Sequence, residues 1–178
     1  MGYRTLSHCL QDLEARNDLI RIDLPVDPWL EVGAIQRRVF QAGGPALLFT
    51  RVKGTSYPMA GNIFGTRKRL QTIFRDTIPV LEHLVKIKAD PVHLFKHPFL
   101  ATKMPSLLWR SRPKRVASGA VTQGETTISK LPQLVSWPED GGAYATLPQV
   151  YSEDPEHPGF RSSNLGMYRI QLSGNNFA

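Results

Sequence analysis

The sequence predicts an α+β fold, in which a small N-terminal α/β domain precedes a mostly β region that looks like an incomplete barrel or sandwich. Apolar residues recur at helical spacing within residues 1–90, and a short alternating strand pattern lies between two of those helices. Residues 116–178 contain short β-like runs separated by Pro and Gly turns. The length of 178 residues, with 41% hydrophobic and 21% charged side chains, suits one ordinary core or two small ones.

The N-terminal domain is expected over residues 1–90, with helices that alternate with short strands. Asp27 supplies an N-cap for the second helix and Pro28 its first helical residue, and Thr66 caps the third. The expected elements are a helix over residues 5–16, a strand over 19–24, a helix from Asp27 to Phe40, strands over 46–49 and 58–62, a basic helix after Thr66 and a helix that begins at Ile78.

A basic linker rich in proline is expected over residues 91–115, because prolines interrupt regular structure there. Residues 86–115 carry 8 basic and 1 acidic side chains, which equals the net charge of +7 of the whole chain. This concentration predicts contact with an anionic surface. Trp109 to Arg115 is the best candidate for nucleic-acid binding, but no nucleic-acid fold surrounds it, so a plain basic linker is favoured over nucleic acid as a partner.

Residues 116–178 are expected to form a partial β domain. Its β-like runs cover residues 116–122, 126–129, 146–151 and 167–172. The carboxylates of residues 139, 140, 153, 154 and 156 lie beside Pro or Gly, which predicts solvated loops.

Composition indicates a cytoplasmic protein. No stretch approaches the roughly 18 apolar residues of a membrane span, and residues 1–16 do not have the pattern of a signal peptide. The single cysteine, Cys9, aligns with apolar helix positions and is expected in the core, with no disulfide inside the chain. His83, His93 and His97 fit no common zinc spacing.

The strongest candidate site is Asn-Leu-Gly-Met-Tyr-Arg-Ile-Gln over residues 164–171. Asn164 offers an amide oxygen and Arg169 a guanidinium, but on a regular strand these two would point to opposite faces. A bulge or bend at Gly166 would let Asn164, at the end of a loop, and Arg169, on a strand, converge on one pocket. The alternative is a turn and an edge strand with a solvated arginine.

Several segments resemble the UbiD family of decarboxylases, which use prenylated flavin mononucleotide (FMN). The specific ones are Trp-Pro-Glu-Asp-Gly-Gly over residues 137–142 and Asn-x-Gly-Met-Tyr-Arg over residues 164–169. Weaker matches over residues 26–31, 43–49 and 61–67 extend the resemblance to nearly the whole chain. Family members are much longer, so the match is to their N-terminal part. It implies that residues 116–178 are the incomplete first part of a split β-barrel flavin-binding domain.

The resemblance also implies roles for individual residues. Asn164 matches the asparagine whose side-chain oxygen binds a divalent metal, usually manganese, and potassium is a further candidate cation. Met167, Tyr168 and Arg169 match the segment that contacts prenylated FMN. Arg169 also matches the arginine of a catalytic Glu-Arg-Glu network, where it would hold the substrate carboxylate and tune a glutamate.

Both glutamates of that network, and the histidine and glutamate that complete the metal site, are expected beyond residue 178. One amide oxygen is far short of the six or so ligands of a hard divalent cation. Two functions therefore stay open. The chain is the N-terminal portion of a carboxy-lyase that reversibly decarboxylates an aromatic or α,β-unsaturated carboxylic acid, or it is a non-catalytic fragment or split-enzyme subunit that docks with a C-terminal partner chain. Self-association and a UbiX-type flavin prenyltransferase, which supplies the cofactor, are also implied.

Overall fold

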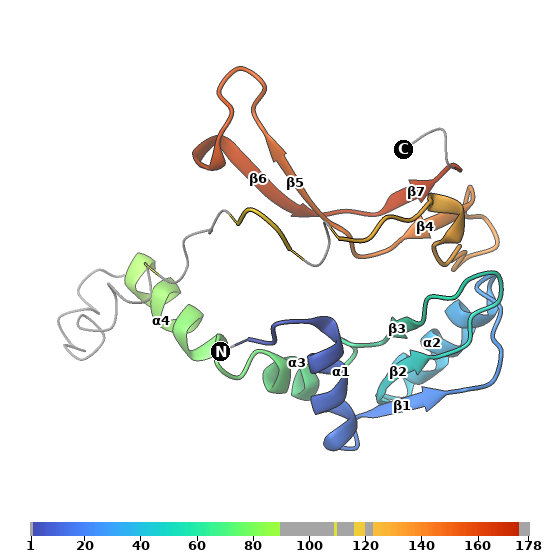
Figure 1. The fold of residues 1–178 in the computed structure, drawn as a ribbon. Helices are drawn as coiled ribbons and strands as arrows, with labels where there is room; N and C mark the ends of the chain where they lie inside the picture. The colour runs from blue at the N-terminus through green and yellow to red at the C-terminus, as the bar shows by residue number, and fades with distance from the viewer. Residues whose placement is uncertain (1, 90–108, 110–115, 120–122, 175–178) are drawn as a thin grey trace.

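The computed structural model describes residues 2–89, 109, 116–119 and 123–174, and it confirms the mixed helix and strand content (Figure 1). Helices α1 to α4 and strands β1 to β3 form a lower unit in this view, and strands β4 to β7 lie above it. The expected linker over residues 91–115 lies outside the described residues, apart from Trp109. Within the described ranges, no helix is long and apolar enough to cross a membrane.

The lower unit is built on a three-stranded sheet with β2 (Ala46–Phe49) in the centre. β1 (Leu19–Ile22) pairs with β2 in parallel, and β3 (Met59–Gly61) pairs with β2 antiparallel. A parallel pair needs a crossover connection, and α2 (Glu31–Gln41) supplies it. All of β2 is buried, as its unbroken apolar sequence predicts for a central strand.

Different helices cover the two faces of this sheet. Because side chains alternate along a strand, Ala46 and Leu48 join a core cluster with α1 (Leu6–Ala15). Leu47 and Phe49 join a second cluster with α2. The core is therefore two small clusters on either side of β2.

The helix signals in the first half of the sequence are largely confirmed. Thr5 and Thr66 each cap a helix by accepting a hydrogen bond from a backbone N–H of the first turn, at 3.2 Å in both cases. Thr66 caps α3 (Arg67–Ile73), and α4 (Ile78–Ala89) begins at the expected residue. Cys9 lies in the core, where burial raises the pKa of its thiol, so a nucleophilic role is disfavoured.

The start of α2 differs from the prediction, because the helix begins at Glu31 and Asp27 is not its N-cap. The Leu30 N–H donates to the Val135 carbonyl at 2.9 Å, and the Val135 N–H donates to the Pro28 carbonyl at 3.1 Å. Residues 28–30 are therefore held in a turn, with Leu30 at a φ of 64°, against a segment from the second half of the chain. Sequence periodicity cannot reveal a long-range pairing of this kind.

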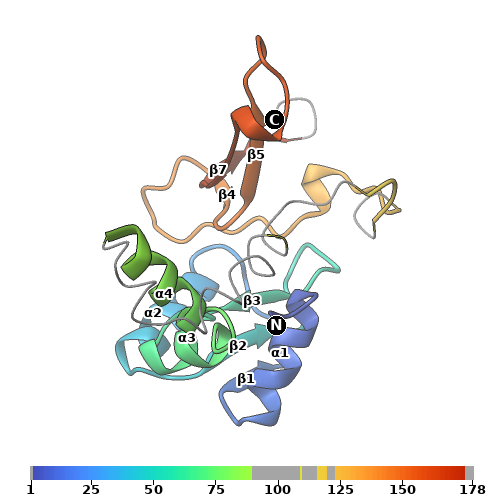
Figure 2. The ribbon, with the colours of Figure 1, turned by 90° about the vertical axis from the view of Figure 1, so that its left-hand side faces the viewer.

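The upper part consists of two antiparallel strand pairs. β5 pairs with β6 over five residue pairs, and β4 pairs with β7 over three. Figures 1 and 2 both place β3 nearest to these pairs among the strands of the lower sheet. The bounds are β4 (Ala143–Ala145), β5 (Gln149–Glu153), β6 (Ser163–Met167) and β7 (Ile170–Leu172).

Several of the expected β runs were misplaced. Residues 128–130 form a 3₁₀ turn, and residues 116–119 are not a strand. The run over residues 146–151 begins at Gln149, because Pro148 and the turn before it separate β4 from β5. The run over residues 167–172 is divided between β6 and β7, with Tyr168 and Arg169 at the break.

Residues 131–136 pack against the lower unit. Leu134 and Val135 are buried, and Leu134 belongs to the same core cluster as Val32 of α2. Arg37 of α2 donates from Nη1 to the Ser136 carbonyl at 2.7 Å. This segment therefore connects the upper strands to α2. The division of the chain into domains over residues 1–90 and 116–178, with a linker over residues 91–115, stays a prediction.

Candidate functional site

Asn164 and Tyr168 form the first half of the candidate site. Asn164 lies on β6, and its amide Nδ2 donates to the hydroxyl oxygen of Tyr168 at 3.3 Å. Both side chains are exposed. This contact uses the amide nitrogen, and the amide oxygen is the atom of this side chain that could bind a metal.

Gly166 acts differently from the prediction. It lies within β6, paired with Val150 of β5, so it forms no bend between a loop and a strand. A Cβ at this position would lie 2.4 Å from Cε2 of the Tyr168 ring. Because glycine has no side chain, the Tyr168 ring can fold back over this position to reach Asn164.

Arg169 forms the second half of the site, at the break between β6 and β7. Its Nη2 donates to Oδ2 of Asp140 at 2.7 Å, and its guanidinium carbon lies 3.9 Å from the centre of the Tyr144 ring. The Arg169 side chain is 42% exposed, whereas the Asp140 side chain is 9% exposed. The guanidinium is thus held on one edge and one face, and the rest of it stays open to solvent.

Asp140 corrects the sequence interpretation, which placed it in a solvated loop. Its Oδ2 accepts the backbone N–H groups of Ser136 at 3.2 Å and Trp137 at 3.1 Å, in addition to Arg169. The Arg169 guanidinium, with smaller contributions from those two N–H groups, holds the pKa of Asp140 below its ordinary value. The sequence could have indicated that the Asp140 side chain accepts hydrogen bonds from backbone N–H groups three and four residues earlier, because such local bonds are common for aspartate. It could not have indicated that Arg169 is the partner of Asp140.

The described contacts join Asn164 to Tyr168, and Arg169 to Asp140 and Tyr144. Within the part of the chain that the structure describes, no side-chain hydrogen bond or ion pair joins Asn164 to Arg169. Met167, the remaining residue of the predicted flavin-contact segment, is 60% exposed on β6. The metal, flavin and catalytic roles of Asn164, Met167, Tyr168 and Arg169 stay predictions.

The residues present fit a cofactor site in part. Asn164 offers a metal one neutral oxygen, and the described residues include no group of three or more His, Cys, Asp or Glu side chains that could hold an ion. His93 and His97 lie outside the described residues. The exposed Tyr168 ring and Arg169 guanidinium offer stacking and positive charge, which suit a flavin and its phosphate.

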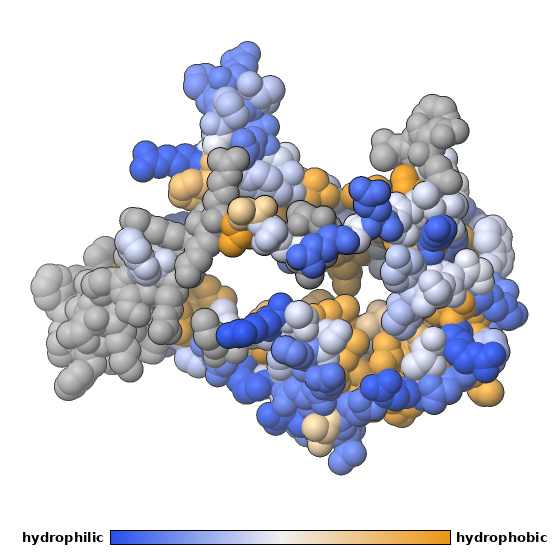
Figure 3. All heavy atoms as spheres, in the orientation of Figure 1, coloured by the Kyte–Doolittle hydropathy of each residue, from blue (hydrophilic) through white to orange (hydrophobic). Residues whose placement is uncertain are grey.

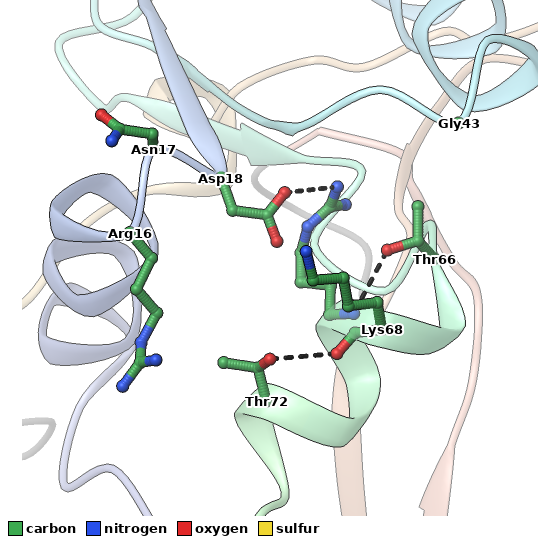
Figure 4. A pocket seen from close by; sticks show the side chains of 8 residues that line it. Arg16, Asn17, Asp18, Gly43, Thr66, Lys68 and Thr72 are labelled. Carbon is green, nitrogen blue, oxygen red and sulfur yellow. Dashed lines mark hydrogen bonds and ion pairs between the residues drawn. The ribbon is translucent and has the colours of Figure 1, made fainter.

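A second feature, a pocket of about 690 Å³ in the lower unit, lies apart from these residues (Figure 4). Its one buried cation, Arg69, is 1% exposed and is held by Asp18 at 3.0 Å and by the carbonyls of Gly44 and Asn62. Arg69 is therefore structural, and it fixes the start of β1 to α3. The lining residues are Arg16, Asn17, Asp18, Gly43, Thr66, Lys68, Arg69 and Thr72.

The substitution Gly166→Ala is expected to push the Tyr168 ring off β6 and to break its hydrogen bond with Asn164. Since Tyr168 is half-exposed, the free energy of unfolding should change by no more than about 1 kcal/mol. The ring proton and Asn164 amide signals in NMR spectra would report the displacement. Gly124→Ala is the control, because a Cβ at Gly124 meets nothing within 4 Å. Unchanged Tyr168 and Asn164 signals in Gly166→Ala would contradict the packing described.

Family models match two segments of this chain. Residues 10–88 match the N-terminal domain of 3-octaprenyl-4-hydroxybenzoate carboxy-lyase, and residues 110–178 match the Rift-related domain of the same enzyme family. These segments include α2, the Ser136–Asp140 turn and all the candidate site residues.

Curated relatives extend this match. An uncharacterized protein of Chlamydia caviae is 41% identical over 175 residues, which cover 96% of this chain and 29% of the relative. A protein of Chlamydia pneumoniae, named as one subunit of a 4-hydroxybenzoate decarboxylase, is 39% identical over 167 residues, covering 91% of this chain and 28% of the relative. The chain thus spans less than a third of the length of these relatives.

Solved structures share the fold. The closed form of vanillic acid decarboxylase from Sedimentibacter hydroxybenzoicus has a TM-score of 0.75 at 24% identity, over 98% of this chain and 36% of that one. The UbiD-class enzyme HmfF from Pelotomaculum thermopropionicum, in complex with FMN, has a TM-score of 0.67 at 26% identity, over 96% of this chain and 35% of that one. The resemblance deduced from the sequence is confirmed, and the chain belongs to the UbiD family, with an N-terminal domain and a Rift-related domain.

Proposed function

We propose that the chain is the N-terminal portion of a carboxy-lyase that reversibly decarboxylates an aromatic or α,β-unsaturated carboxylic acid. The observation that carries this proposal is the exposed surface of Asn164, Tyr168 and Arg169 on a chain of the UbiD family. Two related proteins are named as decarboxylases, and the HmfF structure contains FMN. These names support a flavin-dependent decarboxylation here as well.

In this proposal Arg169 binds the substrate carboxylate. Its guanidinium is fixed by Asp140 and Tyr144 and keeps an open edge, so it can donate two parallel hydrogen bonds to a carboxylate. The cation also stabilises negative charge near the reacting carbon as carbon dioxide leaves. Glutamates that would complete the network are expected in the part of the relatives that this chain does not cover.

Asn164, Met167 and Tyr168 would hold the cofactor. The Asn164 oxygen would supply one ligand to a divalent metal, Mn²⁺ by resemblance with K⁺ as a further cation, and the Tyr168 ring would pack against the flavin. When bound, prenylated FMN supplies the electron sink that protein side chains lack. A UbiX-type prenyltransferase is the proposed source of that cofactor, and the cytoplasm is the proposed location.

A second candidate is a subunit that acts by docking with a chain that carries the rest of the site. The Chlamydia pneumoniae relative, named as one subunit of a decarboxylase, and the two-chain vanillic acid decarboxylase ShVdcCD favour it. The exposed apolar side chains of the upper strands also favour it, and Figure 3 shows apolar residues around the opening between these strands and the lower unit. These side chains are Tyr151, Leu165, Met167, Tyr168 and Ile170.

A chimera tests the proposed activity. This chain would replace the matching N-terminal part of the Chlamydia pneumoniae relative, and release of carbon dioxide from a panel of aromatic and unsaturated acids would be measured with prenylated FMN and Mn²⁺. We expect turnover of at least one acid by the cofactor-loaded chimera and none by this chain alone. A loaded, folded chimera that is inactive on the whole panel would argue against the proposal.

Mixing separates the two candidates. If this chain and the remainder of the relative are active when expressed apart and then combined, the docking subunit is supported. Activity in the fused chimera but none in the mixture would leave the continuous enzyme as the better account.

A further inference from the structure

The orientation of Arg169 is set by a chain of contacts that begins on the lower unit. An arginine side chain has several rotatable bonds, and at a strand end it would sample many positions unless it were held. Asp140 holds one edge of the guanidinium at 2.7 Å, and the Tyr144 ring lies under its face at 3.9 Å. An edge contact and a face contact together fix the plane of the guanidinium as well as its location.

Asp140 is itself fixed by its own turn. Besides Arg169, its Oδ2 accepts the N–H groups of Ser136 and Trp137, and its backbone N–H donates to the Trp137 carbonyl at 3.1 Å. The carboxylate therefore cannot follow Arg169 if the arginine moves. Its side chain is 9% exposed, which sets it apart from an ordinary surface ion pair.

Helix α2 holds the turn over residues 136–140 in place. Arg37 donates to the Ser136 carbonyl at 2.7 Å, and its guanidinium carbon lies 4.4 Å from the centre of the Trp137 ring. Gly33 allows this close approach, because a Cβ there would lie 3.0 Å from both Cα and the carbonyl oxygen of Ser136. The contacts thus run without a gap from α2 through residues 136–140 to Arg169.

From these contacts we propose that Asp140 is a positioning residue for Arg169, and that Arg37 anchors the Asp140 turn to α2. The inference rests on the proposed function in one respect, since it takes Arg169 as the group that binds the substrate carboxylate. In this account the N-terminal domain contributes to the reaction, because it determines the position of the Arg169 side chain.

The positioning can be tested in the full 178-residue chain, without any assay of activity. The Nε–H signal of Arg169 in NMR spectra should be dispersed in the native chain, and Asp140→Asn should move it toward the position of an unrestrained arginine. Asp140→Glu, which keeps the charge, should retain part of the dispersion. Glu139→Gln is the matched control, since Glu139 is an exposed carboxylate in the same turn, and it should change nothing.

The titration of Asp140 gives an independent readout. Its carboxyl signal should titrate below the ordinary value of about 3.9 and move back toward it in Arg169→Gln. Arg37→Gln should move it part of the way, whereas Arg38→Gln, a change at the exposed neighbour on α2, should not. The pKa of Asp140 is lower in the folded chain than in the unfolded chain. The Asp140–Arg169 pair therefore stabilises the fold at pH values above the ordinary pKa of an aspartate. This stabilisation is lost as the pH falls through the lowered pKa of the folded chain.

The activity of the chimera provides a third test of the positioning role of Asp140. We expect Asp140→Asn to lower kcat/KM about 10- to 100-fold, with partial recovery in Asp140→Glu and full activity in Glu139→Gln. An Arg169 signal that is unrestrained in the native chain, or unaltered by Asp140→Asn, would overturn the proposal. So would full activity of Asp140→Asn in an active chimera. An inactive native chimera would count against the proposed function alone, because the NMR results judge the positioning separately.

Discussion

Arg69→Met is expected to be the most destabilising single change in the lower unit. Its guanidinium is 1% exposed and donates to the Asp18 carboxylate and to the carbonyls of Asn62 and Gly44, so its loss leaves three acceptors without this donor. Removal of one partner of a buried pair costs about 3–5 kcal/mol. Asp18 is 32% exposed and can be rehydrated, which places the expected loss near the lower end of that range.

Urea denaturation followed by circular dichroism would measure this loss. Arg67→Met is the matched control, because Arg67 is exposed on the same helix and its loss should change the unfolding free energy by no more than about 0.5 kcal/mol. Domains are typically stable by about 5–15 kcal/mol, so Arg69→Met should shift the midpoint strongly. Equal midpoints for the two variants would show that Arg69 does not hold α3 to β1.

Arg169→Gln is expected to have the largest effect on activity. In the active chimera it should lower kcat/KM by about 100- to 1,000-fold, as the loss of a charge-stabilising donor at a reacting centre does. Arg169→Lys should recover little, because an ammonium cannot match the planar fork that Asp140 and Tyr144 orient.

The control for this change is Arg161→Gln, at an exposed arginine in the 3₁₀ turn that precedes β6. It removes the same charge from the same region of the chain and should leave kcat/KM within about twofold. Carbon dioxide release at several substrate concentrations would separate kcat from KM. Comparable losses in Arg161→Gln and Arg169→Gln would point to a general effect of charge and not to a role for Arg169.

Local signals in the sequence predicted the first half of the fold well. The apolar run that forms β2 has the bounds that the structure gives, and Thr5, Thr66 and Ile78 begin helices as expected. Each of these features is decided by residues close together in sequence, through capping or a short apolar pattern. The start of α2 was wrong because Leu30 pairs with Val135, and a contact of such long range leaves no periodic trace.

The same distinction between local and long-range signals applies to the candidate site. The segment from Asn164 to Arg169 could be recognised because its residue types and spacing are specific, and the family it indicated is confirmed. Asp140 was missed because a carboxylate beside a Pro and Gly turn is normally solvated. Its importance arises from Arg169, which is close in space only because β4 pairs with β7.

The structure of the chimera bound to FMN and Mn²⁺ would test the central claim most directly. We predict that the Asn164 oxygen lies in the ligand shell of the metal, that Tyr168 contacts the flavin, and that Arg169 faces the same cavity while still paired with Asp140. A flavin bound with Asn164 and Arg169 on opposite sides of the sheet, facing no common cavity, would contradict the account.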